Sequence, residues 1–215
     1  MLTPSELAAL AAAWEPARAA GVLGSASLSD LWEHTAGFVS AVCSSFSGRA
    51  EQLNLRVVDV GTGAGVPGLL LAHQLPRSHV TLLDASERRL DHVRRARRAL
   101  ELLDRTTIAH GRAEDVGRFP DFRGAFDVAV ARLLGDPRDT LELLVPFVRS
   151  GGLLVVSTTE AAADVWAQLP VEGLPLGPAV VQGTSDRFAS IRLVGAIPDT
   201  LPRPPKARQR APFFR

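Results

Sequence analysis

The stretch VVDVGTGAGVPG, residues 57–68, decides the fold of this chain. An apolar run that reaches Asp59 is followed by Gly61, Gly63 and Gly65, and then by an apolar run that suits a helix. Glycines at such a junction allow a tight turn and a close approach of the backbone to a ligand, and the next helix begins with unpaired N–H groups. The stretch therefore predicts a strand, a ligand-binding loop and a helix.

The spacing of these glycines separates the candidate ligands. A dinucleotide site needs Gly-x-Gly-x-x-Gly around a pyrophosphate, whereas this loop reads Gly-x-Gly-x-Gly with Asp59 two positions before it. No Gly-Lys-Ser/Thr follows, which excludes a P-loop. Asp84 ends the next apolar run, where a carboxylate can accept both hydroxyls of a ribose. These features favour a nucleoside without phosphate, namely S-adenosylmethionine, over a dinucleotide or an empty relic of such a site.

Apolar runs typical of strands alternate with helical segments beyond the loop. The predicted strands are 55–60, 80–84, 107–110, 126–131 and 153–158, and the predicted helices between them include 66–75, 86–103 and 137–148. Two further runs, 179–182 and 188–194, flank a Gly-Thr-Ser-Asp turn and predict a hairpin. This order predicts an α/β fold with βαβ units around a parallel sheet.

The two ends of the chain differ from its centre. Residues 1–47 are rich in alanine and predict a helical extension, with one helix opening at Pro4 and a second one capped by Ser29. Residues 48–198 form the predicted ligand-binding domain. Residues 199–215 are rich in proline and arginine and predict an irregular basic tail.

Composition excludes several classes of protein. The chain has 215 residues, and its 24 Lys and Arg nearly balance 23 Asp and Glu, which excludes a wholly disordered chain and a uniformly basic nucleic-acid coat protein. Cys43 is the single cysteine, so an internal disulfide and a cysteine-based zinc cluster are excluded, and no metal site is predicted. No apolar run is long enough to span a membrane and no cleavable signal is evident, so we expect a soluble, cytoplasmic protein.

Several of these segments resemble one known family. The runs DVGTGAGVPGLLLA, TLLDASERRLDHVRRA, GRAED and FDVAVAR are similar to the bacterial small-subunit (16S) ribosomal RNA guanine-N7 methyltransferases, the RsmG or GidB type. Val66-Pro67-Gly68 after the loop is the more specific part of this likeness. Leu31-Trp32-Glu33-His34 resembles the family's N-terminal Trp-Glu-Arg-His helix, and Leu201-Pro202-Arg203 resembles its terminal Pro-Arg segment. The resemblance covers residues 28–215 and is strongest over 55–132.

The resemblance implies a fold and an activity. The fold is that of a class I S-adenosylmethionine-dependent methyltransferase, which is Rossmann-like, with helices on both faces of a seven-stranded mixed sheet whose last strand is antiparallel. The activity is transfer of a methyl group to N7 of a guanine in small-subunit ribosomal RNA. The N7 lone pair is already a nucleophile, so alignment of donor and acceptor can supply most of the catalysis. The residues expected at the cofactor are Asp59, Gly61, Gly63, Gly65, Val66, Asp84, Ala113, Glu114 and Arg132.

Arg132 is the best candidate for a catalytic residue. It follows a predicted strand at the sheet edge where ligands bind, and its guanidinium could pair with guanine O6 or with a phosphate. The alternative is an ion pair with Asp127 or Asp136. Glu114 is expected beside the adenine, or else as a carboxylate at the start of a helix. Asp59 is expected at the methionine end of the cofactor, or else in hydrogen bonds that hold the glycine loop.

Two basic segments are candidates for contact with ribosomal RNA. The first is the arginine helix, with Arg88, Arg89, Arg94, Arg95, Arg97 and Arg98, and the second is the tail at 203–215, with Arg203, Lys206, Arg208, Arg210 and Arg215. The alternative for the helix is a solvated face on which Asp91 and Glu101 form i,i+4 ion pairs. We expect a monomer that binds ribosomal RNA or the small ribosomal subunit.

The sequence departs from the family after the predicted strand at 153–158. The family usually carries Lys-Gly there, whereas this chain reads Ser157-Thr158-Thr159-Glu160. The arginine of the N-terminal helix is also missing. Two alternatives therefore stay open, namely a class I methyltransferase with a different substrate and a protein that binds S-adenosylmethionine without turnover. A closed apolar pocket would favour the first alternative, and loss of space beside Gly63 would favour the second.

Overall fold

The computed structural model describes residues 3–132, 134–169, 175–183 and 187–210. Its strands are β1 (Arg56–Val60), β2 (His79–Asp84), β3 (Thr106–His110), β4 (Phe126–Arg132), β5 (Val148–Thr158), β6 (Val180–Gln182) and β7 (Arg187–Arg192). Its helices are α1 (Pro4–Ala19), α2 (Leu28–Phe46), α3 (Gly68–Gln74), α4 (Glu87–Ala99), α5 (Ala113–Val116), α6 (Pro137–Leu144), α7 (Glu160–Ala167) and α8 (Pro205–Arg210), with short 3₁₀ turns at Leu103–Arg105 and Val145–Phe147.

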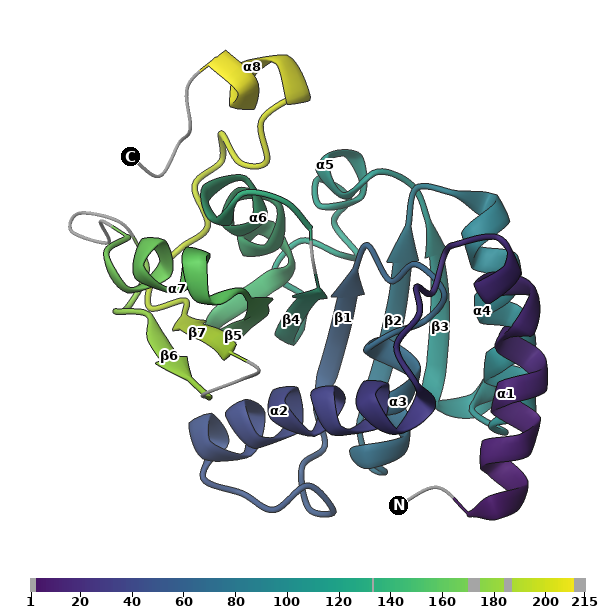
Figure 1. Ribbon diagram of the computed structural model, residues 1–215. Helices are drawn as coiled ribbons and strands as arrows, with labels where there is room; N and C mark the ends of the chain where they lie inside the picture. Colours follow the sequence, from purple (N-terminus) through teal and green to yellow (C-terminus); the bar gives the residue numbers. More distant parts are fainter. Residues whose placement is uncertain (1–2, 133, 170–174, 184–186, 211–215) are drawn as a thin grey trace.

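The strands form one seven-stranded sheet in the order β3-β2-β1-β4-β5-β7-β6 (Figure 1). Strands β1 to β5 are parallel, and β7 is antiparallel to both of its neighbours. The strand order reverses between β1 and β4, and in open α/β sheets the crevice at the carboxyl ends of such strands is where ligands bind. The topology therefore places the candidate site at the ends of β1, β2 and β4.

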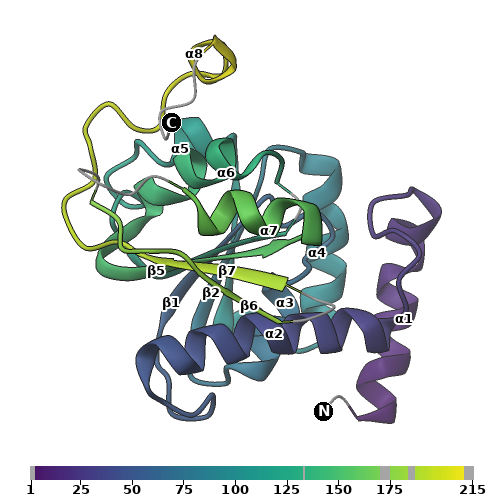
Figure 2. The ribbon, with the colours of Figure 1, turned by 60° about the vertical axis from the view of Figure 1, so that its left-hand side comes forward.

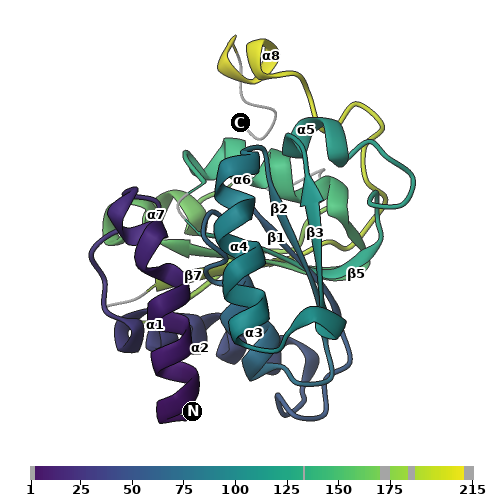
Figure 3. The same cartoon turned by 90° about the vertical axis from the view of Figure 1, so that its right-hand side faces the viewer.

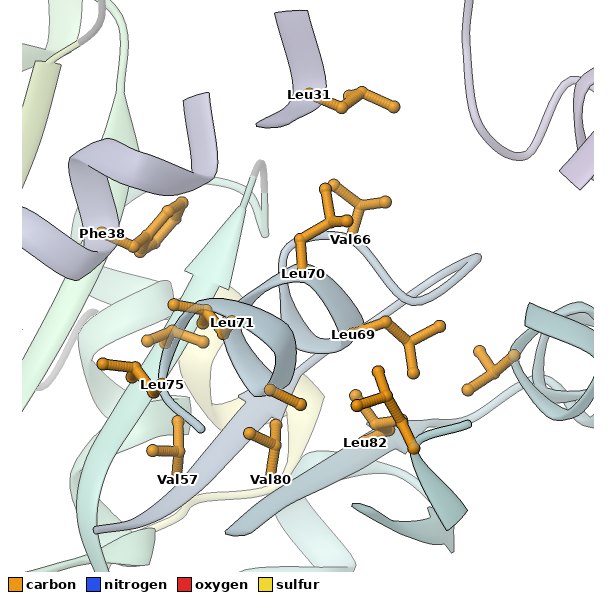
Figure 4. Packing of buried hydrophobic residues seen from close by; sticks show 14 of the residues in the cluster. Leu31, Phe38, Val57, Val66, Leu69, Leu70, Leu71, Leu75, Val80 and Leu82 are labelled. Carbon is orange, nitrogen blue, oxygen red and sulfur yellow. The ribbon is translucent and has the colours of Figure 1, made fainter. Parts of the chain in front are cut away.

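Alternate residues of the central strands face two helical layers (Figure 2). On one face, Val57 and Val80 belong to a buried cluster with side chains of α1 to α4; Figure 4 shows Leu69, Leu70 and Leu71 of α3 beside them. On the other face, the cluster contains side chains of α6, α7 and the C-terminal segment. Burial on both faces explains why the central strands β1, β2 and β4 are largely apolar rather than alternating.

The two N-terminal helices pack on the first of these clusters. Helix α1 lies along α4 (Figure 3), and its Leu10 and Trp14 are fully buried. Phe38 of α2 is also fully buried, and its ring contacts that of Phe188 in β7. The helices expected in the N-terminal extension are therefore part of the core of the sheet domain.

Local capping sets the start of these helices. Thr3 and Glu6 form a capping box at α1, as the opening at Pro4 predicts. The prediction that Ser29 caps the second helix is wrong, because Ser27 is the cap and forms a capping box with Asp30. Both positions carry serine, but only Ser27 has an acidic residue three positions later to complete the box.

Three other predicted elements differ from the structure. The predicted helix 86–103 begins after the Ser86 cap but ends at Ala99, because Glu101 adopts a left-handed backbone conformation with φ 53°. The predicted helix 137–148 divides into α6 and a 3₁₀ turn that contains Pro146, since proline cannot donate the next helical hydrogen bond. Part of the C-terminal tail is helical, as α8, rather than irregular throughout.

The hairpin prediction is confirmed for its strands, β6 and β7, whereas residues 184–186 of its turn and residues 211–215 of the tail lie outside the described residues. Within the described ranges, no helix combines the length and the apolar character that crossing a bilayer requires.

Candidate functional site

Two cavities flank the glycine loop at the carboxyl edge of the sheet. The Asp84 cavity, of about 290 Å³, is lined by residues that include Asp84, Gly111, Ala113, Glu114, Leu134 and Arg208. The Arg132 cavity, of about 320 Å³, is lined by residues that include Gly21, Gly63, Val66, Arg88 and Arg132. Gly61 and Arg89 line both cavities, so the two spaces meet at the loop.

Backbone geometry opens the loop toward these cavities. The amides of Gly61 and Thr62 both donate to the carbonyl oxygen of Leu83 in β2, at 2.8 and 2.9 Å. Gly63 has φ 59°, and a Cβ atom added there would meet no heavy atom within 4 Å. The space beside Gly63 is therefore open, and a side chain there would occupy the cavity.

Asp59 lies behind the loop and lines neither cavity. It is fully buried, and its Oδ2 accepts hydrogen bonds from Thr62 Oγ1 at 2.6 Å and from the Gly68 amide at 2.9 Å. Burial raises its pKa to about 6, although these hydrogen bonds oppose the shift. Its Oδ1 is buried and has no hydrogen-bond partner within the described residues. Of the two interpretations of Asp59, the geometry supports the one in which it holds the loop.

Asp84 joins the loop to α4. Its Oδ2 accepts from the Gly63 amide at 2.9 Å, and its Oδ1 accepts from the Ser86 amide at 2.9 Å. Arg89 lies 3.7 Å from the same Oδ1. The carboxylate is buried and lies in the wall of the cavity, so it faces any ligand in that space.

Ala113 and Glu114 lie across the Asp84 cavity, where α5 begins. The Glu114 carboxylate is buried and accepts a hydrogen bond from Arg112 Nε at 2.8 Å. Burial acts to raise the pKa of Glu114, but the hydrogen bond from Arg112, a hydrogen bond from the backbone and the charge of Arg112 outweigh burial and lower that pKa. Glu114 is thus both a carboxylate at a helix start and part of the cavity wall, so the geometry excludes neither interpretation.

Arg132 ends β4, opposite Ser157 of β5, and its guanidinium lines the other cavity. The alternative of a pair with Asp127 or Asp136 is wrong. Asp127 pairs with Arg149 at 2.6 Å, and Asp136 caps α6 through the Arg138 amide. Burial lowers the pKa of Arg132, and the charge of Asp59 opposes this.

Gly65 and Val66 are neighbours in the loop, but only one of them lines a cavity. Val66 lines the Arg132 cavity. Gly65 lines neither cavity and has φ 98°, so it shapes the turn, with the Leu69 side chain packed against it. Of the nine residues expected at the cofactor, the structure therefore brings all except Asp59 and Gly65 into the cavity walls.

Two walls of the site come from the ends of the chain. Ala20, Gly21 and Val22, which follow α1, line the Arg132 cavity, and Arg208 of α8 lines the Asp84 cavity. Both segments are distant in sequence from the loop that they approach. Periodicity and spacing carry no signal for such contacts, which is why sequence reasoning missed them.

The arginines of α4 differ in their surroundings along the length of the helix. Arg88 and Arg89 reach the cavity, whereas Arg94 pairs with Glu87 at 2.7 Å and with Asp91 at 2.8 Å. The expected i,i+4 pairs are wrong, since Asp91 pairs at i,i+3 and Glu101 lies beyond the end of α4. In the tail, Arg203 pairs with Glu142, and Arg208 lies near Glu114, so these two side chains face the protein.

Comparison with known proteins identifies relatives of this chain. A family described as GidB, rRNA small subunit methyltransferase G, matches residues 14–173. The ribosomal RNA small subunit methyltransferase G of Acetivibrio thermocellus is 38% identical over 112 residues, which are 52% of this chain and 46% of the relative. The one from Dictyoglomus thermophilum is 30% identical over 166 residues, 74% of this chain and 69% of the relative. The chain spans about half the length of the first curated relatives it matches.

A solved structure supports the fold. The O-methyltransferase from Bacillus cereus in complex with SAH superposes with a TM-score of 0.58 at 17% identity, over 86% of this chain and 90% of that chain. At this identity the likeness establishes the fold alone. The predicted fold class, a seven-stranded mixed sheet of the class I methyltransferase type, is confirmed.

Proposed function

Because this chain belongs to the rRNA small subunit methyltransferase G family, which matches residues 14–173, we propose that it methylates N7 of a guanine in small-subunit ribosomal RNA, with S-adenosylmethionine as the donor. The proposed partner is ribosomal RNA or the small subunit, and the proposed form is a cytoplasmic monomer. Residues 48–198 are proposed as the S-adenosylmethionine-binding methyltransferase domain, with 1–47 as its helical extension and 199–215 as its basic tail.

The observation that carries this proposal is the division of charge across the glycine loop. Buried carboxylates of Asp84 and Glu114 line one cavity, together with Arg89, Arg112 and Arg208. The other cavity is lined by Arg88, Arg89 and Arg132 and, among the described residues, by no carboxylate. Carboxylates suit the hydroxyl and amino donors of an adenosine, whereas guanidinium groups suit guanine O6 and phosphates. The two cavities meet at Gly61, so a donor on one side can reach an acceptor on the other.

The residues present fit S-adenosylmethionine. Asp84 would accept the ribose hydroxyls, Ala113 and Glu114 would contact the adenine, and the open backbone at Gly61 and Gly63 would hold the methionine end. When bound, this cofactor supplies an electrophilic methyl group on a sulfonium. Open space beside Gly63 supports a bound cofactor over a site that has lost it.

The protein's part in the chemistry is to position the acceptor. Guanine N7 carries a free lone pair, so no side chain needs to remove a proton from it. Arg132 is half-buried, which strengthens a hydrogen bond from its guanidinium to guanine O6 or to a phosphate. Fixing the acceptor beside the donor can supply about 7–11 kcal/mol of the barrier.

The missing lysine after β5 has a substitute in this arrangement. Ser157 lies beside Arg132 in the sheet register, and Arg88 and Arg89 bring two further cations to the same cavity from the start of α4. The acceptor side is therefore cationic without a lysine on β5. Three guanidinium groups around the cavity favour an acceptor with phosphates over an uncharged metabolite.

Purified protein, radiolabelled S-adenosylmethionine and small subunits that lack N7-methylguanosine test the proposal. We expect label in the ribosomal RNA and N7-methylguanosine after digestion. Arg132→Ala should lose transfer by at least about a hundredfold while it still binds S-adenosylhomocysteine. Transfer by Arg132→Ala at the wild-type rate would contradict the role of Arg132, and label in a different nucleoside would contradict the reaction.

A further inference from the structure

The C-terminal tail is fastened to the body of the protein before it reaches the site. Arg123 donates to the carbonyl oxygens of Leu201 and Pro198, at 2.7 and 2.9 Å, and Arg118 donates to that of Pro202. Leu201 is fully buried among the side chains of the second core cluster. The tail therefore follows a defined path across α5 and α6 toward the carboxyl edge of the sheet (Figures 1 and 3).

A buried ion pair fixes the next residue of the tail. Glu142 of α6 is 0% exposed, and its Oε1 and Oε2 accept from Arg203 Nε at 2.9 Å and from an Arg203 terminal nitrogen at 2.7 Å. The Arg203 amide also donates to Oε1, at 3.1 Å. A buried carboxylate needs such partners, because one left without them is strongly destabilising. Arg203 is thus an anchor point of the tail.

Helix α8 begins two residues later and brings one more cation to the cavity. Arg208 is 9% exposed and donates to the carbonyl oxygen of Arg203 at 3.0 Å. Its other terminal nitrogen lies 3.8 Å from Glu114 Oε1. Arg208 and Glu114 both line the same cavity as Asp84. A residue of the tail therefore completes the wall of the proposed nucleoside site.

We propose that Arg208 is a positioning residue for the adenine of the cofactor. Its guanidinium, held by the anchored tail 3.8 Å from Glu114 Oε1, keeps the Glu114 carboxylate turned toward the cavity, where the carboxylate accepts a hydrogen bond from the exocyclic amino group of adenine. Arg112 holds the same carboxylate from the solvent side, through its bond to Oε1. This inference rests on the proposed function, because it takes an adenosyl cofactor as the occupant of the cavity.

The test compares two ligands by calorimetry. S-Adenosylhomocysteine carries the amino group, whereas S-inosylhomocysteine carries an oxygen in its place, which a carboxylate repels. Arg208→Met should raise the Kd of the adenosyl ligand about tenfold and that of the inosyl ligand by less than about twofold. Arg208→Lys keeps a cation and should recover part of the loss. Lys206→Met, on an exposed residue of the same helix, is the matched control and should bind both ligands as the wild type does.

A double variant tests whether Arg208 affects ligand affinity through Glu114. In the Glu114→Gln background, Arg208→Met should add less than about a twofold change for the adenosyl ligand. If Arg208→Met does not fold, as judged by its thermal melting, Arg208→Gln makes the same comparison with a neutral side chain that still carries a donor.

Two results would overturn the inference. Wild-type affinity of Arg208→Met for the adenosyl ligand would do so, and so would an equal loss for both ligands, which would indicate a general effect on the fold. Failure of the wild-type chain to bind S-adenosylhomocysteine is a different result, since it would overturn the proposed function and, with it, this inference.

Discussion

Trp14 of α1 donates its indole N–H to the carbonyl oxygen of Ala64 in the glycine loop, at 2.9 Å. Both residues are buried. The bond joins the N-terminal helix to the loop that separates the two cavities, and the residues that follow α1 line one of those cavities. Helix α1 therefore supports the site through the glycine loop, although the residues that follow it, rather than the helix itself, line the cavity.

Trp14→Phe tests this link. Phenylalanine keeps most of the buried ring but leaves the Ala64 carbonyl without its donor, so we expect the free energy of unfolding to fall by about 1–3 kcal/mol. Affinity for S-adenosylhomocysteine should fall as well, because the loop loses its support. Urea unfolding and calorimetry measure the two effects. Trp32→Phe is the matched control, since Trp32 packs against His73 of α3 instead, and equal losses in both variants would contradict the assignment.

The pKa of Asp59 sets a pH dependence of stability. Its value rises from 3.8 to about 6 in the folded chain, mainly because the carboxyl is buried. The folded state therefore holds this proton more tightly than the unfolded state does. The resulting stabilisation is present below pH 4 and is lost as the pH rises through about 6.

Asp59→Asn removes this titration and keeps an oxygen that can accept from Thr62 and Gly68. The free energy of unfolding of the wild type, relative to that of Asp59→Asn, should fall by about 2.5 kcal/mol between pH 4 and pH 7. Urea unfolding of both proteins across this range measures the difference, in which other titrating groups cancel. A difference that is constant or rises with pH would show that Asp59 is not the buried acid described above.

The sequence predicts more of the sheet than of the site. Strand positions follow from short apolar runs, and the loop follows from the spacing of Gly61 and Gly63, because both signals are local. The start of α2 at Ser27 rather than Ser29 depends on which serine finds a partner at Asp30, a choice between two similar caps.

Long-range contacts determine the parts of the site that the sequence does not predict. Asp59 and Asp84 are equally acidic in sequence, but burial behind the loop removes the first from the cavity, while the second lies in its wall. Arg208 was expected among cations available to RNA, whereas its position near Glu114 depends on the Arg203–Glu142 pair, which joins residues 61 positions apart. No periodic pattern encodes such a pairing.

Breaking the ion pair between Arg203 and Glu142 should lower the stability of the folded chain strongly. Arg203→Met leaves a fully buried carboxylate without its cation, so we expect the free energy of unfolding to fall by about 3 kcal/mol. Arg203→Met with Glu142→Leu removes both charges and should recover most of the loss. Urea unfolding measures both variants, with Lys206→Met as the control. A double variant no more stable than Arg203→Met alone would contradict a specific pair.

Arg88 should contribute to RNA binding more than other arginines of α4 do. It is exposed at the mouth of the Arg132 cavity, with no ion pair among the described residues, whereas Arg98 lies more than two turns farther along the same helix. Arg88→Ala should weaken binding of a ribosomal RNA fragment and reduce the slope of log affinity against log salt concentration by about 1. Arg98→Ala is the matched control, and filter binding over a range of salt measures both. Equal slopes for the two variants would place the RNA contact elsewhere.

The most direct test of the central claim is the N7-methylguanosine content of small-subunit ribosomal RNA, measured by mass spectrometry in cells with and without the gene for this chain. We expect N7-methylguanosine in the small-subunit ribosomal RNA of cells that have the gene, its loss on deletion, and its return with the wild-type gene but not with Arg132→Ala. Equal N7-methylguanosine in both kinds of cell would contradict it.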